Sequence, residues 1–163
     1  MNHASVLSQF ERLLPLAVTW ATEEEQTILR EGAPLSEKEI SDARAIGVQS
    51  PHRVRLLQIE TIPRPSHPEL NGACDAIDFL TPATRGLTLG YGIFIRWDCW
   101  RDRLLVVHEL AHVAQYERFG GILPFLRKYL FECLTMEYAA SPLELEAIAA
   151  AAGVCNERVI ISL

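Results

Sequence analysis

The spacing of hydrophobic residues predicts helices in the first third of the chain. Over residues 5–31 apolar side chains recur at helical intervals and are followed by an acidic cluster, which predicts one or two amphipathic helices with a solvated patch. Ser36 followed by Glu39 has the sequence of a capping box, in which each residue bonds a free amide of the other. We therefore expect a short helix through Ile46, ended by Gly47.

The middle of the chain has the features of strands and loops. Residues 53–62 are rich in aliphatic and β-branched side chains, which is typical of a strand. Three prolines and further turn residues make 63–85 a long expected loop, with at most a short strand near residues 76–80. Residues 86–96 form the second expected strand, and its two internal glycines indicate a bulge or a close approach of another backbone.

Helical periodicity returns after the second strand. Residues 104–116 contain no helix breaker and are mostly apolar, so this segment reads as a core helix. Asp98 or Asp102 can cap its start, and Gly120 with Gly121 can end it.

Two more helices are expected toward the C-terminus. Residues 122–138 carry an apolar face, which predicts packing on the core. Ser141 and Pro142 open an alanine-rich helix that we expect to stop at Gly153. The apolar tail 159–163 is either a short strand or a docking segment.

These elements, at this length, predict a single α+β domain. We expect a small twisted sheet, containing strands 53–62 and 86–96, packed against the helices. Residues 1–50 form a helical lead-in, and residues 51–163 form the core.

Composition and charge exclude several classes of partner. The chain has 49% hydrophobic and 22% charged residues and a net charge of −6, as ordinary globular proteins do. No run of lysine or arginine is present, which argues against a nucleic-acid partner. No apolar stretch reaches 18 residues, so no membrane span is expected.

The sequence also favours a cytoplasmic location. The apolar run 13–21 follows Glu11 and Arg12 and is interrupted by Pro15, so we interpret it as part of a helix and not as an export signal. The four cysteines are scattered and form no CxxC pair. They are expected to be reduced thiols that contribute to packing.

The core helix carries an HExxH pattern. Because His108 and His112 are four residues apart, they share a helical face and can offer two imidazole nitrogens to one tetrahedral zinc ion. Glu109 is turned by about 100° from His108, which places its carboxylate where it can take a proton from a water molecule. The alternative is a buried helix that holds two hydrogen-bonded histidines without a metal. Zinc would satisfy both histidines at once and is the preferred interpretation.

The third zinc ligand must be a glutamate or a cysteine. The chain has no histidine and no aspartate after His112, and an HExxHxxGxxH arrangement is excluded because Gln115 and Arg118 occupy the positions concerned. Glu144 and Glu146 start a separate helix, where rigid placement is easy. Glu117 points away from the histidine face. The remaining candidates lack a recognisable context: Glu132, Glu137, Glu157, Cys133 and Cys155.

Several motifs together resemble a known family. They are GLTLGYGIFIR at 86–96, HELAHVAQYE at 108–117 and PLELEA at 142–147. Over roughly residues 45–150 the chain is similar to a group of uncharacterised bacterial gluzincin-like domains. Gluzincins use two HExxH histidines and a glutamate from a later helix, often within Glu-x-x-Ala-Asp.

The resemblance implies a zincin-like fold for the core, 51–163, and a zinc metallopeptidase activity with Glu144 as the third ligand. Ile148 takes the place of the aspartate that usually orients a ligating histidine, which weakens the expected support of the metal. The runner-up ligand is Glu146. Glu144 has a rival role, because Ser141 and Glu144 also form a capping-box sequence. Tyr138 is a candidate hydrogen-bond donor to a tetrahedral intermediate.

The expected activity is hydrolysis of peptide bonds by zinc-activated water, with one zinc per chain and Glu109 as general base. The partner is then a peptide or protein, which could pair with the strand before the core helix. The alternative is a non-catalytic binding module whose zinc holds its helices together.

Overall fold

The computed structural model describes residues 3–136 and 140–160, and over these residues the protein is α+β. Six α-helices surround a four-stranded mixed sheet in the described residues. Two 3₁₀ turns, η1 (Pro51–Arg53) and η2 (Trp97–Cys99), lie in the connections. The elements are α1 (His3–Glu31), β1 (Ala33–Pro34), α2 (Glu37–Ala45), β2 (Arg55–Ile59), α3 (Pro68–Ala76), β3 (Gly86–Leu89), β4 (Gly92–Arg96), α4 (Arg103–Phe119), α5 (Ile122–Thr135) and α6 (Pro142–Ile160).

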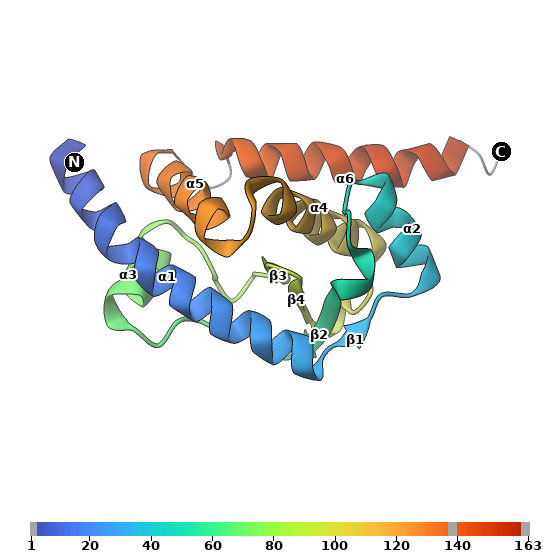
Figure 1. Ribbon diagram of the computed structural model, residues 1–163, viewed down its shortest axis with the longest axis horizontal. Coiled ribbons are helices and arrows are strands. Elements are labelled where there is room, and N and C mark those ends of the chain that lie inside the picture. The colour runs from blue at the N-terminus through green and yellow to red at the C-terminus, as the bar shows by residue number, and fades with distance from the viewer. Residues whose placement is uncertain (1–2, 137–139, 161–163) are drawn as a thin grey trace.

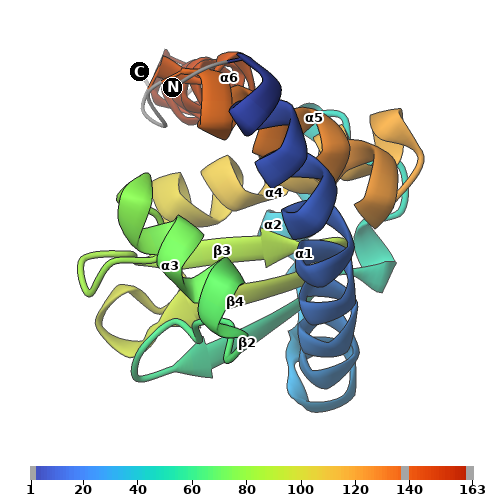
Figure 2. The same ribbon diagram turned by 90° about the vertical axis from the view of Figure 1, so that its left-hand side faces the viewer.

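The sheet has the strand order β1-β2-β4-β3. Strand β2 pairs in parallel with β4, whereas the two outer pairs are antiparallel. Helix α1 runs below the sheet in Figure 1, and α4 and α6 lie above it. Figure 2 shows the same layers from the end, with α3 beside the sheet on the side of α1. The sheet is therefore covered on both faces.

Alternating residues of β4 join the two sides of the core. Ile93 and Ile95 pack in one hydrophobic cluster with α2 and α4, whereas Phe94 belongs to a second cluster with α1 and α3. Successive side chains of a strand point to opposite faces, and all three residues are buried. A central strand of this kind is apolar throughout because both of its faces are covered.

The expected strand 86–96 proves to be a hairpin, so the prediction of a single strand was wrong. Leu89 pairs with Gly92, which leaves Gly90 and Tyr91 as a two-residue turn. Gly90 has φ of 63°, a conformation that glycine adopts without strain and that such tight hairpins require. The reversal makes β3 an edge strand and places β4, which precedes α4, inside the sheet. A peptide therefore cannot pair with the strand directly before the core helix, as the sequence led us to expect, because both edges of β4 are already paired.

Other boundaries also differ from expectation. The segment expected to be a loop, 63–85, contains α3, and residues 76–80 form no strand. Pro68 stands in the first turn of α3, where its missing amide is harmless. Three residues of α3 are buried at helical spacing: Leu70, Ala73 and Cys74. The sequence predicted a loop here because the segment is rich in proline and other turn residues, and the short amphipathic pattern was not recognised.

The last helix is longer than expected. Helix α6 continues past Gly153 to Ile160, because one glycine inside a helix costs only about 1 kcal/mol. Arg103 forms an ion pair with buried Asp42 and also donates to the carbonyl of Val154, so the chain beyond Gly153 keeps a tertiary contact. The capping box of Ser36 and Glu39 is confirmed.

The expected absence of a membrane span agrees with the described helices. Within residues 3–136 and 140–160, no helix is both long enough and apolar enough to cross a bilayer.

Candidate metal centre

Helix α4 positions both histidines. Asp102 accepts a hydrogen bond from the amide of Leu105 at the helix start, and Gly120 ends the helix with φ of 94°, as a left-handed C-terminal glycine does. Between these ends most side chains of α4 are buried. His108 and His112 stand one turn apart, and their Nε2 atoms are 3.2 Å from each other.

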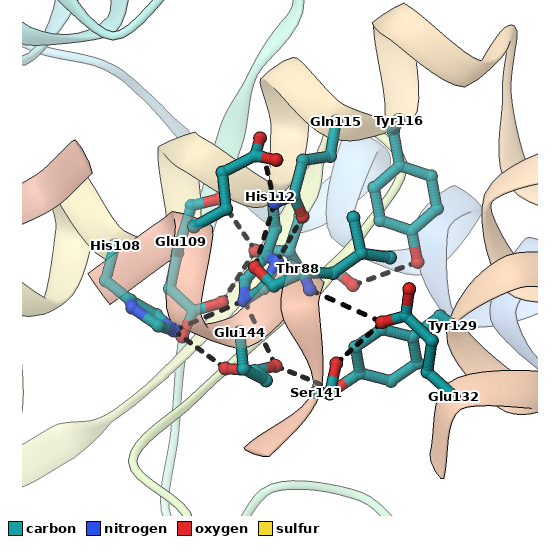
Figure 3. Close-up of polar contacts among 12 residues, drawn as sticks. Thr88, His108, Glu109, His112, Gln115, Tyr116, Tyr129, Glu132, Ser141 and Glu144 are labelled. Atoms are coloured by element: carbon teal, nitrogen blue, oxygen red, sulfur yellow. Dashed lines mark hydrogen bonds and ion pairs between the residues drawn. The ribbon is translucent and has the colours of Figure 1, made fainter. Parts of the chain in front are cut away.

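Glu144 comes to the histidines from α6, which packs along α4 (Figure 3). Its Oε2 atom lies 3.5 Å from Nε2 of His108, and its Oε1 atom lies 3.4 Å from Nε2 of His112. Candidate ligand atoms of the three residues all lie within 4.8 Å of one another. The fold thus brings together two helices that are separated by α5 in the sequence.

The ligand types of this triangle and the spacing of its two histidines fit a zinc ion. Two imidazole nitrogens and one carboxylate are the ligand types of catalytic zinc. Two ligands with bonds of about 2.0–2.1 Å at a tetrahedral angle lie about 3.3–3.4 Å apart, and the Nε2 atoms of His108 and His112 are 3.2 Å apart. Each histidine also has a different oxygen of Glu144 within 3.5 Å. The residues present therefore fit the metal that the HExxH spacing predicts.

Gln115 fixes the orientation of His112. Nδ1 of His112 lies 2.8 Å from Oε1 of Gln115, and Nε2 of Gln115 donates to the carbonyl of Leu143. Because a carbonyl can only accept, the amide nitrogen of Gln115 must face Leu143 and its oxygen must face the histidine. Neutral His112 then carries its proton on Nδ1 and presents the lone pair of Nε2 to the cluster. Ile148, at the position where the resembled sequences usually have an aspartate, is more than half exposed. His112 is instead supported by Gln115, which belongs to α4 itself.

Tyr129 of α5 holds Glu144. Its hydroxyl donates to Oε1 of the carboxylate at 2.8 Å, and its ring stacks on Phe125, which in turn stacks on Tyr116. This aromatic column fixes the hydroxyl beside the cluster. Tyr138, the tyrosine proposed from the sequence, lies outside the described residues.

The charges of the cluster support one another. Burial opposes a positive charge on His112, but the carboxylates of Glu144 and Glu109 outweigh it and raise the pKa of the imidazole. Burial likewise opposes a negative charge on Glu144. Hydrogen bonds from His108, His112 and Tyr129 reverse that effect and hold the pKa of the carboxyl well below its usual range. Glu144 is therefore ionised at neutral pH, as a metal ligand must be.

Glu109 lies beside the triangle and is held from the edge strand β3. The hydroxyl of Thr88 donates to Oε2 of Glu109 at 2.6 Å. The other oxygen, Oε1, is next to Gly86, where a Cβ atom would come within 2.6 Å of it. Gly86 thus leaves the space that the carboxylate fills. This arrangement keeps one carboxylate oxygen bonded to Thr88 and places the other beside Gly86.

Other glutamates considered as ligands form different contacts. Glu146 makes a two-pronged ion pair with Arg118. Glu117 accepts from the amides of Gln49 and Ser50, so its expected position away from the histidines is confirmed. Neither belongs to the cluster with Glu144.

Buried Glu132 organises the start of α6. Its Oε2 atom accepts from the hydroxyl of Ser141 and from the amide of Leu143, and Lys128 lies 3.0 Å from its Oε1 atom. A carboxylate is stabilised at a helix N-terminus by the free amides and the helix dipole. Glu132 thereby anchors the turn that carries Glu144. Glu137 and the side chain of Glu157 lie outside the part of the chain that the structure describes.

The cluster opens into a cavity of about 140 Å³. His108, Glu109, His112 and Glu144 line one part of it, and apolar side chains line most of the rest. The side chain of His108 is 22% exposed, whereas those of His112 and Glu144 are 9% and 8% exposed. The site is consequently approached past His108.

Sequence reasoning named the triangle of His108, His112 and Glu144 but missed the residues that support it. Gln115 is three residues after His112 in the same helix, so its contact could have been found from helical spacing. Thr88, Gly86, Tyr129 and Glu132 reach the site through tertiary packing, for which the sequence gives no local signal.

Comparisons of the chain with protein-family models, with curated proteins and with solved structures find no match.

Proposed function

We propose that this protein is a zinc-dependent peptidase. The observation that carries the proposal is the triangle of His108, His112 and Glu144, with Glu109 beside it and a cavity in front of it. Zinc would supply a Lewis acid that polarises a peptide carbonyl and makes water a nucleophile at neutral pH.

The number of ligands favours a catalytic site over a structural one. Structural zinc sites are closed by four protein ligands, whereas catalytic sites have three and an open position. In the described part of the chain the cluster contains three such residues, and the cavity reaches all three. The proposed zincin-like character of the fold rests on this site and on the motifs of the sequence.

Glu109 would act as general base and then as general acid. Oε1 would accept a proton from the attacking water as the water oxygen bonds to the carbonyl carbon. The same proton would pass to the amide nitrogen as the C–N bond breaks, so that an amine and a carboxylic acid leave. Thr88 keeps the carboxylate in place through Oε2.

Strand β3 would guide an extended peptide. It is an edge strand, and its residues Gly86, Leu87 and Thr88 line the cavity beside Glu109. A peptide that lies along such an edge can be held through its main chain, whatever its side chains.

Replacing Glu109 tests the proposal. Glu109→Gln should retain one zinc per chain, measured by elemental analysis, because Glu109 is not part of the triangle. Its hydrolysis of an unfolded-protein mixture, followed by mass spectrometry, should fall by about 10²–10⁴-fold, the usual contribution of a general base. Equal cleavage by wild type and variant would overturn the role of Glu109, and a chain that takes up no zinc would overturn the proposal as a whole.

A second candidate is a binding module in which zinc fastens α4 to α6. The position of the three residues on these two packed helices favours it. In that case zinc removal should lower the unfolding temperature, and wild type should cleave no peptide in the mixture. Cleavage that depends on Glu109 would exclude this candidate.

A further inference from the structure

The cavity extends well beyond the metal triangle. Beyond Glu109 and Glu144 it is enclosed by α1, α3, α5 and the segment 77–80. In Figure 1 these three helices lie together at the left. Small side chains leave the space between them: Ala17 and Ala21 of α1 and Ala73 of α3.

Most of the side chains that line this cavity are apolar. Leu126 and Leu130 of α5, Leu70 of α3 and Trp20 of α1 are among the residues that line it. Transfer of an apolar group from water to such a surface is favourable by roughly 25 cal/mol for each Å² buried. A cavity lined in this way has few groups that could hold ordered water.

Its size fits one large side chain. An apolar cavity of about 150 Å³ is sufficient to bind benzene, and this cavity, together with its part at the metal triangle, measures about 140 Å³. An aromatic ring or a branched aliphatic group is therefore the appropriate occupant.

The charges around the cavity exclude an acidic occupant. Carboxylates of Asp78, Glu109 and Glu144 line it, and no lysine or arginine is among its described lining residues. The proposed zinc would offset the charges of Glu109 and Glu144, but elsewhere in the cavity an acidic side chain would leave water without a partner cation.

We infer that this cavity is the specificity pocket for the proposed peptidase and takes an aromatic or large aliphatic side chain next to the cleaved bond. The inference rests on the proposed function, because continuity of the cavity with Glu109 places its occupant beside the reacting carbonyl. The lack of a basic lining residue also means that the pocket does not bind a free carboxylate terminus, which argues against a carboxypeptidase.

Binding of small probes tests the pocket without any hydrolysis. N-acetyl-phenylalaninamide, added to the zinc-loaded protein, should shift the methyl NMR signals of Leu126 and Leu130. N-acetyl-alaninamide and N-acetyl-aspartamide should bind at least roughly tenfold more weakly, since burial of a large apolar side chain corresponds to roughly a ten- to hundredfold gain in affinity. Equal binding of the three amides would overturn the inference. Binding of decanoate alone would overturn it too and would assign the cavity to a free acyl chain.

Two variants change the size of the pocket in opposite directions. Ala73→Leu fills it and should remove binding of N-acetyl-phenylalaninamide, whereas Ala149→Leu, at an exposed position of α6, should not. Leu130→Ala widens the pocket. It should therefore improve the binding of a larger probe, N-acetyl-naphthylalaninamide, relative to that of N-acetyl-phenylalaninamide. If Ala73→Leu does not fold, Leu130→Ala still tests the pocket.

A peptide library separates failure of the pocket from failure of the peptidase. Wild type should cleave beside phenylalanine, leucine or methionine, and Ala73→Leu should shift cleavage to smaller residues. Cleavage that ignores side chains, unchanged in Ala73→Leu, overturns the pocket and leaves the peptidase intact. Selective binding of the phenylalanine amide without any cleavage retains the pocket as a binding site and overturns the peptidase.

Discussion

The amide oxygen of Gln115 lies 2.8 Å from Nδ1 of His112, and the amide nitrogen of Gln115 bonds the carbonyl of Leu143 in α6. One buried side chain therefore orients a histidine of α4 and ties it to the helix that carries Glu144.

Removing this contact should weaken metal binding. We expect Gln115→Leu to lower zinc affinity by about 10–100-fold, the usual effect of removing a partner of a metal ligand. Competition with a coloured zinc chelator measures the affinity. Gln26→Leu, at an exposed position of α1, is the matched control and should bind zinc as wild type does. Unchanged affinity in Gln115→Leu would show that Gln115 does not support the metal.

Glu144 and Glu146 should respond oppositely to the same substitution. Glu144→Gln should lose zinc affinity by at least about 100-fold, because a ligand contributes more than its outer partners do. Glu146→Gln should keep its zinc, since Glu146 pairs with exposed Arg118. Elemental analysis after dialysis, together with circular dichroism to check folding, measures both effects. Zinc retained in Glu144→Gln would remove Glu144 from the ligand set.

Zinc affinity should decrease as the pH falls. Metal and proton compete for His112, whose pKa is raised by the neighbouring carboxylates. Protonation therefore begins above the ordinary imidazole value of about 6.5, and the affinity should already decline there as pH is lowered. Glu144, whose pKa is depressed, stays ionised throughout this range and adds nothing to the decline. Chelator competition between pH 8 and pH 5 tests this, and a constant affinity across the range would contradict it.

A methyl group at position 86 should disturb Glu109 without removing zinc. In Gly86→Ala the new Cβ would lie 2.6 Å from Oε1 of Glu109, so the carboxylate must move. We expect hydrolysis to fall by about tenfold or more, because misplacement by about 1 Å can cost 10²-fold, while zinc content stays the same. Gly153→Ala is the matched control: no atom lies within 4 Å of its new Cβ, and it should stabilise α6 by about 0.5–1 kcal/mol. Full activity in Gly86→Ala would argue against the placement of Glu109 as base.

The cysteines should differ in reactivity toward iodoacetamide. Burial, with help from the carboxylates of Glu144 and Glu132, raises the pKa of the Cys133 thiol to about 12. Burial also raises the pKa of Cys74. At pH 8 both are essentially protonated and inert, whereas Cys99 and Cys155 are partly exposed. Peptide mass spectrometry should find Cys99 and Cys155 alkylated first in the folded protein. Early labelling of Cys133 would show that its surroundings open in solution.

Local patterns determined much of the fold. The capping box of Ser36 and Glu39 and the caps of α4 at Asp102 and Gly120 depend on residues within one or two turns of each other, and each was predictable from the sequence. The same is true of His108 and His112, because helical geometry alone places residues four apart on one face.

Only the tertiary structure decided how the supporting groups meet. Whether 86–96 was one strand or a hairpin depended on the pairing of Leu89 with Gly92, and that pairing placed β3, Gly86 and Thr88 beside Glu109. Tyr129 and Glu132 act on Glu144 and its helix only because α5 folds back against α4 and α6. Sequence spacing specifies neighbours along one element, whereas these contacts arise from packing between elements, where burial and the need to pair every buried polar group select one arrangement.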